Sequence, residues 1–256
     1  MTLRLDELAV RYADRMALQP CSAELPAATL VGLVGPNGAG KSSLLRAVAG
    51  LTSAAGRAAW MGRRLDELEP RARARTVAYL PQAAASHWQL SVGDLVALGR
   101  LPHQRFGAAP SAEDLAAVSA AMQATQVADF ATRPVGELSS GERARVLLAR
   151  ALAVRAPVLL VDEPVASLDP YHQLQIMAVL QAYASNGALV IAVMHDLALA
   201  ARFCARILLL EKGVLVADGS PAQVLQPATV RRHYRVEPYL ARHEEQTVIV
   251  PWRTLE

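Results

Sequence analysis

The sequence predicts an α/β fold organised around a parallel β-sheet. Apolar runs at residues 30–34, 158–161 and 188–194 have the composition of strands, and the run at 158–161 is continuous, as in strands buried on both faces of a parallel sheet. A glycine-rich loop follows the first run and leads into a helix-compatible segment. From residue 83 to residue 156 the pattern changes to helical periodicity, which indicates an inserted helical subdomain.

The composition argues against several classes of protein. With 256 residues, 53% of them hydrophobic, the chain can bury a large core and form one large domain or two small ones. The net charge of +3 is mild and the arginines are not interleaved with aromatic residues, so we expect no nucleic-acid partner. No apolar run approaches the length of a membrane span, and Asp6 and Glu7 lie where a signal peptide would be apolar. We therefore expect a soluble, cytoplasmic protein.

The cysteines and histidines lack the spacing of metal ligands. Cys21 and Cys204 lie far apart in the sequence, so we interpret them as reduced structural thiols. The histidines that we expect on the surface, without a metal, are His87, His103, His172, His233 and His243.

Turn residues and apolar spacing predict the elements in chain order. The first part is expected to hold strands at 3–10, in a short stretch ending near Pro26, and at 30–34, 57–61 and 77–80, with a helix at 43–49. In the helical insert, Ser91 caps a helix at 92–100, Ser111 caps a helix running to about Thr125, and a third helix includes 143–154. The rest is expected to hold strands at 158–161 and 188–194, helices at 172–183 and 197–203, and a hairpin of 206–210 with 214–217. Two short helices and a tail follow from Pro221.

The segment Gly35-Pro36-Asn37-Gly38-Ala39-Gly40-Lys41-Ser42, here called the phosphate loop, fits the pattern G-x-x-x-x-G-K-[ST]. Its glycines allow a tight turn in which successive amide N–H groups point at phosphate oxygens near a helix N-terminus. Lys41 can then place a compact charge between the β- and γ-phosphates, and the Ser42 hydroxyl can bind Mg²⁺. Lys41 and Lys212 are the only lysines among 26 basic residues, which supports a chemical reason for lysine in the loop.

Two acidic residues, Asp162 and Glu163, follow directly on the apolar run at 158–161. They are expected at the carboxyl end of a strand, where ligands bind in α/β sheets. Asp162 fits a ligand of Mg²⁺, and Glu163 fits the general base for an attacking water. Taken alone, such a pair is equally the capped start of a helix, but the phosphate loop upstream favours the catalytic interpretation.

Two further features are ambiguous by themselves. Tyr12 follows the first strand, where its ring could stack on a purine or pack as a surface aromatic residue. The segment Leu138-Ser139-Ser140-Gly141-Glu142, here called the signature segment, opens a helix and could form an anion site or only an N-cap. Its position between Ser42 and Asp162 in the sequence favours the anion site.

Taken together, these motifs resemble those of ABC-type ATPase subunits over nearly the whole chain. Six elements occur in the family's order: the phosphate loop, Gln82, the signature segment, Asp162-Glu163, Ser167-Leu168-Asp169 and His195. The resemblance implies a P-loop NTPase (RecA-like) core with an antiparallel β subdomain and an inserted α-helical subdomain. Within one domain of 1–256, residues 1–82 and 157–220 would form the nucleotide-binding core, 83–156 the helical subdomain and 221–256 a C-terminal tail.

The resemblance also implies a role for each matching residue. Tyr12 would stack on adenine, and His195 would hydrogen-bond the γ-phosphate. Gln82 would touch Mg²⁺ or the attacking water and report the nucleotide state to a membrane partner. The expected ATP-binding residues are Tyr12, Gly35, Pro36, Asn37, Gly38, Ala39, Gly40, Lys41, Ser42, Ser43, Ser139, Gly141 and Asp169. The expected catalytic residues are Lys41, Gln82, Glu163 and His195, and the expected Mg²⁺ ligands are Ser42, Gln82 and Asp162.

In such a family two copies of the subunit stack head to tail. Ser139 and Gly141 of one copy would approach the γ-phosphate held by the other, with Asp169 at the interface, so that a monomer would have an incomplete site. Closure would align water for in-line attack while Mg²⁺ and Lys41 offset the developing charge. The sequence departs from the family at Ser140, where glycine is usual. Because Ser139 and Gly141 are intact, we expect only a mild effect of this departure.

Segments at 95–103, 195–197, 200–204 and 231–237 are similar to those of ATPases from bacterial importers of iron-siderophores, haem and cobalamin. The resemblance implies a peripheral subunit on the cytoplasmic face of the inner membrane, with a transmembrane permease as partner and a periplasmic substrate-binding protein as an indirect one. The alternatives are the ATPase of an exporter and a regulatory module that binds nucleotide without hydrolysing it. Glu163 argues against the second, because degenerate sites usually lose the base.

Overall fold

A six-stranded sheet forms the centre of the computed structural model, which describes residues 1–82, 90–105, 107–166, 168–244 and 246–255. The order of its strands is β10-β9-β3-β8-β7-β6. Their bounds are β3 (Thr29–Val34), β6 (Val77–Leu80), β7 (Val158–Asp162), β8 (Leu189–Val193), β9 (Arg206–Glu211) and β10 (Val214–Gly219). Neighbours from β9 to β6 pair in parallel, whereas β10 pairs antiparallel with β9. The predicted α/β fold is thereby confirmed.

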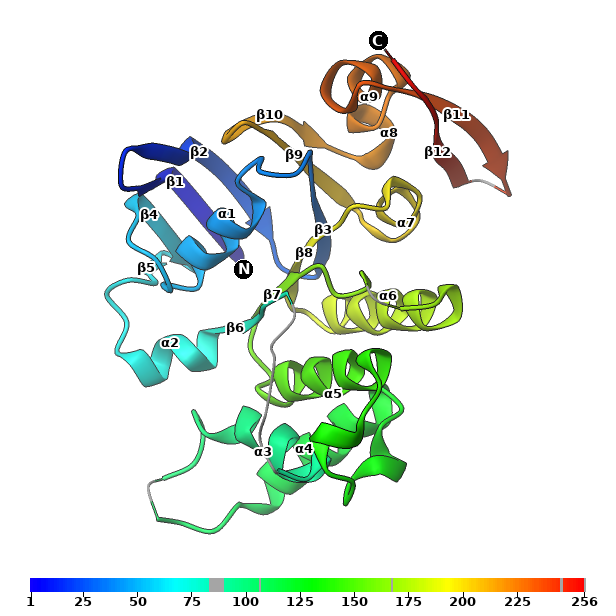
Figure 1. Ribbon diagram of the computed structural model, residues 1–256. Helices are drawn as coiled ribbons and strands as arrows, with labels where there is room; N and C mark the ends of the chain where they lie inside the picture. The colour runs from blue at the N-terminus through cyan, green and yellow to red at the C-terminus, as the bar shows by residue number, and fades with distance from the viewer. Residues whose placement is uncertain (83–89, 106, 167, 245, 256) are drawn as a thin grey trace.

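Alternate residues of the central strands enter two different cores. In β7, where every residue is buried, Leu159 and Val161 belong to one apolar cluster and Val158 and Leu160 to the other. Three helices cover the first face of the sheet, α5 (Ser140–Ala153), α6 (Pro170–Ser185) and α7 (Leu197–Phe203), and α1 (Lys41–Val48) lies against the second (Figure 1). Burial on both faces explains why the sequence of β7 is apolar without alternation.

An antiparallel sheet, of strand order β2-β1-β4-β5, packs on the same side of the central sheet as α1. Its strands are β1 (Thr2–Tyr12), β2 (Arg15–Pro26), β4 (Ala55–Trp60) and β5 (Arg63–Arg64). The second strand was expected to be short, but β2 extends over 12 residues opposite β1, with irregularities in their register. The sequence also gave no indication of β5 or of α2 (Pro70–Thr76), because β5 has two residues and α2 buries none of its own.

The helical insert contains α3 (Val92–Ala97), a 3₁₀ turn at Leu98–Arg100, α4 (Ala112–Ala124), 3₁₀ turns at Ala128–Phe130 and Val135–Glu137, and α5. The predicted caps are present: the side chains of Ser91, Ser111 and Ser139 accept hydrogen bonds from the amides three residues ahead. For Ser111 and Ser139 the third residue of the helix returns a bond to the cap, which completes a capping box.

Arg100 is buried and connects three elements of the helical insert. Its side chain is only 2% exposed, and its Nε donates to Asp114 Oδ1 at 2.8 Å. Its Nη1 donates to the carbonyl oxygens of Ala153 and Val154 at 2.9 and 3.4 Å, at the end of α5. One side chain therefore joins the 3₁₀ turn after α3 to the start of α4 and the end of α5.

The C-terminal part begins with the two short helices that the sequence predicted, α8 (Pro221–Val224) and α9 (Pro227–Tyr234). A hairpin of β11 (Val236–His243) and β12 (Gln246–Thr254) follows, where the sequence predicted only a tail. Figure 1 shows this hairpin beside α8 and α9, at the opposite end of the molecule from the helical insert. Within the described part of the chain, the helices are all too short or too polar to cross a membrane.

The cysteines conform to expectation and two histidines do not. Cys21 and Cys204 are buried and unpaired. His233 was expected on the surface, but its side chain is 10% exposed and its Nδ1 lies 2.7 Å from Glu211 Oε2. His103 is half-buried and bonds through Nε2 to the Val154 carbonyl at 2.9 Å. His87 lies outside the described residues. The end of α5 holds the His103 ring, and the contact with Glu211 holds the His233 ring. The spacing of histidines in the sequence does not predict either contact.

Candidate nucleotide site

The phosphate loop joins the end of β3 to the start of α1, as its sequence predicted. Gly35, Gly38 and Gly40 have φ values of 144°, 76° and 100°, which residues with a Cβ rarely adopt. Space is short as well: a Cβ on Gly35 would lie 2.0 Å from the Leu210 carbonyl oxygen, and one on Gly40 2.3 Å from that of Ala17. Because neighbouring backbone lies so close to the loop, glycine is required at both positions.

The turn between β9 and β10 supports the outer side of the phosphate loop. Gly213 N–H donates to the Ala39 carbonyl at 2.9 Å, and the Gly213 carbonyl accepts from Gln19 N–H at 2.8 Å. Lys212, the residue before it, has a left-handed φ of 49° and an exposed side chain. The loop is thus fixed to strands that lie far from it in the sequence.

Lys41 is the first residue of α1 and is only 6% exposed. Its ammonium donates to the carbonyl oxygens of Gly35 at 2.7 Å and Pro36 at 3.0 Å. Burial lowers the pKa of Lys41, and the negative charges of Glu163 and Asp162 oppose that shift. The side chain is therefore held inside the loop, near two carboxylates.

The two acidic residues at the end of β7 have separate sets of partners. Asp162, 2% exposed, accepts from Ser42 Oγ at Oδ1, at 3.1 Å. Glu163 accepts from Gln82 Nε2 at one oxygen and lies 2.6 Å from His195 Nε2 at the other. The structure thus brings together around this edge five of the side chains expected to act in catalysis or metal binding: Ser42, Gln82, Asp162, Glu163 and His195.

A cavity of about 420 Å³ opens beside the loop. The lining residues are Tyr12, Arg15, Ala17, Asn37, Gly38, Ala39, Gly40, Lys41, Ser42, Ser43, Glu163 and His195. Ten of them belong to the expected ATP-binding set or are Glu163 or His195, and Tyr12 is 42% exposed on the cavity's rim. Sequence reasoning missed Arg15, because nothing in a strand-end arginine indicates that the first hairpin folds over the phosphate loop.

The donor set at this edge fits magnesium. Ser42 and Asp162 supply oxygen atoms within hydrogen-bond distance of each other, next to amides suited to phosphate. Mg²⁺ usually takes one or two protein oxygens and fills its other positions with water and substrate phosphates. The described residues contain no cluster of three or more His, Cys, Asp or Glu that could hold a metal ion.

Among the expected ATP-binding residues outside the phosphate loop, three do not line this cavity. Ser139, Gly141 and Asp169 are absent from its described lining, and Ser167 lies outside the described residues. Ser139 is the N-cap of α5, and its backbone hydrogen bond lowers the pKa of Glu142. Asp169 is the N-cap of α6 and lies 2.7 Å from His172 Nδ1. Within one chain these groups belong to two helix starts rather than to the cavity beside the phosphate loop.

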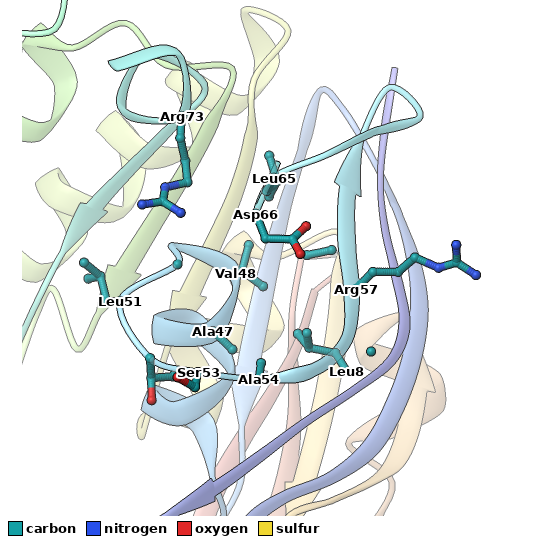
Figure 2. A pocket seen from close by; sticks show the side chains of 14 residues that line it. Leu8, Ala47, Val48, Leu51, Ser53, Ala54, Arg57, Leu65, Asp66 and Arg73 are labelled. Atoms are coloured by element: carbon teal, nitrogen blue, oxygen red, sulfur yellow. The ribbon is translucent and has the colours of Figure 1, made fainter. Parts of the chain in front are cut away.

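A second cavity, of about 480 Å³, lies next to the end of α1. Figure 2 shows Val48, Leu65 and Arg73 among the side chains that surround it, contributed by α1, the segment after β5 and α2. None of its lining residues was expected to bind nucleotide. The guanidinium of Arg73 packs against Gly50, where an added Cβ would come within 2.7 Å of Nη1.

Comparisons with known proteins agree with the motifs. A family model described as ABC transporter matches residues 18–166. The chain is 39% identical to the hemin import ATP-binding protein HmuV of Pseudomonas aeruginosa over 250 residues, which are 95% of this chain and 96% of that one. It is 46% identical to the cobalamin import ATP-binding protein BtuD of Halobacterium salinarum over 234 residues, 90% of this chain but 58% of the relative's length.

The arrangement of elements also has a close counterpart among solved structures. A protein described as a metal-chelate type ABC transporter, in an inward-facing conformation, superimposes with a TM-score of 0.83 over 98% of this chain and 97% of that one. The two sequences are 24% identical, so this likeness concerns the fold.

Proposed function

Because the chain belongs to the ABC transporter family of ATP-binding subunits, a family of ATPases, we propose that it hydrolyses ATP to drive transport through a separate membrane permease. The observation that carries the proposal is the position of Glu163, which lines the same cavity as Lys41 and Ser42 and contacts both Gln82 and His195. A carboxylate in that environment can accept a proton from water as the bond to the γ-phosphate breaks.

Different residues around the cavity bind the nucleotide and catalyse its hydrolysis. Loop amides and Lys41 hold the phosphates, and Tyr12 stacks on the base at the rim. Glu163 receives the proton of the attacking water, with Gln82 and His195 holding its two oxygens in position. When bound by Ser42 and Asp162, with Gln82 near it, Mg²⁺ supplies positive charge to the phosphate oxygens.

The absence of Ser139, Gly141 and Asp169 from the described lining of the cavity supports a site shared between two copies. We propose that α5 of a second copy, stacked head to tail, brings Ser139 and Gly141 to the γ-phosphate, with Asp169 at the interface. The helical insert at 83–156 then acts as the arm that carries the signature segment, and 1–82 with 157–220 as the nucleotide-binding core.

Similarity to two import ATP-binding proteins, one named for hemin and one for cobalamin, supports import of a haem, cobalamin or iron-chelate substrate. In this proposal the subunit lies on the cytoplasmic face of the membrane, and a periplasmic substrate-binding protein delivers the substrate to the permease. Purification of the permease complex together with such a binding protein tests this direction of transport, whereas a complex that releases its substrate from the cytoplasm would identify an exporter.

Replacing Glu163 by Gln tests hydrolysis directly. Loss of the base is expected to lower ATP turnover by about a hundredfold or more while ATP binding persists. The matched control is Glu67→Gln, which makes the same change on an exposed side chain that does not line the cavity. A wild-type protein that binds ATP but hydrolyses it no faster than Glu163→Gln would instead be a regulatory nucleotide-binding module.

A further inference from the structure

The proposed magnesium ligand Asp162 has a second partner that the catalytic motifs do not include. Tyr79, on β6, donates its hydroxyl hydrogen to Asp162 Oδ2 at 3.3 Å, while Ser42 donates to Oδ1 at 3.1 Å. The two donors come from different elements, β6 and α1, and each meets a different oxygen. Strand β6 also leads to Gln82, which contacts Glu163. Residues in this strand or just after it therefore contact both acidic residues.

We propose that Tyr79 is a positioning residue whose hydroxyl fixes the orientation of the Asp162 carboxylate and thereby sets the metal affinity of the nucleotide site. This inference rests on the proposed Mg²⁺–ATP chemistry. The terminal torsion of an aspartate is soft, so one hydrogen bond leaves the carboxylate plane free to turn. Bonds at both oxygens fix that plane and leave the remaining lone pairs for a metal. Partners of this kind orient the ligands of metal sites in general.

Tyr79 is itself held in place. It is half-buried in β6, in parallel register with Leu160 of β7. Arg46 of α1 approaches the same hydroxyl, and hydrogen bonding to Tyr79 is the main cause that raises the pKa of Arg46. A tyrosine hydroxyl has one hydrogen, and here that hydrogen is donated to Asp162. Sequence reasoning missed this residue because a tyrosine in a buried strand has no motif of its own.

The test is Tyr79→Phe, which removes one oxygen and keeps the ring. Free Mn²⁺ is measured by electron paramagnetic resonance in titrations of the protein with a non-hydrolysable ATP analogue. We expect Mn²⁺ affinity to fall about three- to tenfold, at or below the lower end of the range for lost partners of metal ligands, because the bond is long. Affinity for the analogue in EDTA should not change. Placing 4-aminophenylalanine at position 79 restores a donor and should restore Mn²⁺ affinity.

Tyr183→Phe is the matched control, since that hydroxyl donates to the Ala156 carbonyl at 2.8 Å, remote from the cavity lining. It should leave Mn²⁺ affinity unchanged. Equal Mn²⁺ affinities in wild type and Tyr79→Phe would overturn the inference, as would an equal loss of analogue affinity in EDTA. A wild type that binds no Mn²⁺ with the analogue would overturn the proposed metal chemistry itself.

Discussion

Among single residues, Glu163 has a left-handed backbone, which it shares with several other non-glycine residues of the described chain. Its φ of 54° lies in the left-handed region, directly after the last residue of β7. Such a conformation costs on the order of 1–3 kcal/mol in a residue that is not glycine, and it persists where the surroundings enforce it. Here the contacts with Gln82 and His195 hold the side chain over the cavity. The residue that we propose as the general base therefore has a strained backbone conformation.

Lys41 allows a test at the same scale, because the chain contains one other lysine. Lys41→Arg is expected to lower ATP turnover by about a hundredfold, since a planar guanidinium cannot occupy the buried position between two carbonyls and misplaced groups lose catalytic geometry. Lys212→Arg makes the same change on an exposed side chain. Steady-state hydrolysis of both variants is the measurement, and comparable rates would contradict a role for Lys41 in holding phosphate.

Among elements, the start of α5 can be compared with the start of α4. Both helices begin with a serine in a capping box, so Ser139→Ala and Ser111→Ala should each cost about 1 kcal/mol of stability. Only Ser139→Ala should also reduce ATP turnover. Chemical denaturation and hydrolysis assays on the two variants separate the roles. If both lose activity equally, Ser139 is a cap and nothing more.

The helical insert depends on Arg100, which connects the 3₁₀ turn after α3 with α4 and α5. Arg100→Met removes its buried hydrogen bonds and is expected to lower the free energy of unfolding by about 3 kcal/mol. Arg133→Met, on a partly exposed arginine of the same insert, should cost far less. Urea unfolding curves of both variants test this, and similar midpoints would show that the buried contacts of Arg100 contribute little.

The same contact predicts a pH dependence. Hydrogen bonds from Arg100, and then from Ser111, lower the pKa of Asp114 from 3.8 to about 2. The folded form therefore favours the charged carboxylate. Its contribution to stability is fully present above the unfolded pKa and is lost as the pH falls towards about 2. The stability difference between wild type and Asp114→Asn, measured by urea unfolding from pH 7 to pH 3, should shrink only in the acidic part of that range.

At the scale of the whole molecule, the two proposed halves of the ATP site lie on different parts of one chain. We therefore expect Glu163→Gln, which binds ATP without cleaving it, to run as a dimer in size-exclusion chromatography with ATP and Mg²⁺ and as a monomer without them. Adding Ser139→Arg should block that dimer and leave ATP binding measurable, because it obstructs the contact with the second copy. An unchanged dimer in the double variant would rule out the head-to-tail arrangement.

The sequence predicted what depends on local chemistry. Glycines in the phosphate loop, serine caps in the insert and the apolar run of β7 each follow from a requirement that short segments reveal. Contacts made by distant strands do not appear in such segments: the approach of Arg15 to the loop depends on how β1 and β2 fold over it, and that of Tyr79 to Asp162 on the pairing of β6 with β7. Likewise β11 contains Pro238 and several charged residues, so its sequence gives little indication of a strand.

The scarcity of lysine has a practical consequence for spectroscopy. A dye that reacts with primary amines can attach at Lys212 or at the chain's α-amino group, because Lys41 is shielded by the loop that surrounds it. Once the α-amino group has been blocked, such a dye would attach a single fluorophore at Lys212, on the turn whose Gly213 is bonded to Ala39. Its emission would follow movements of the nucleotide pocket in real time, in a protein that needs no engineered attachment point.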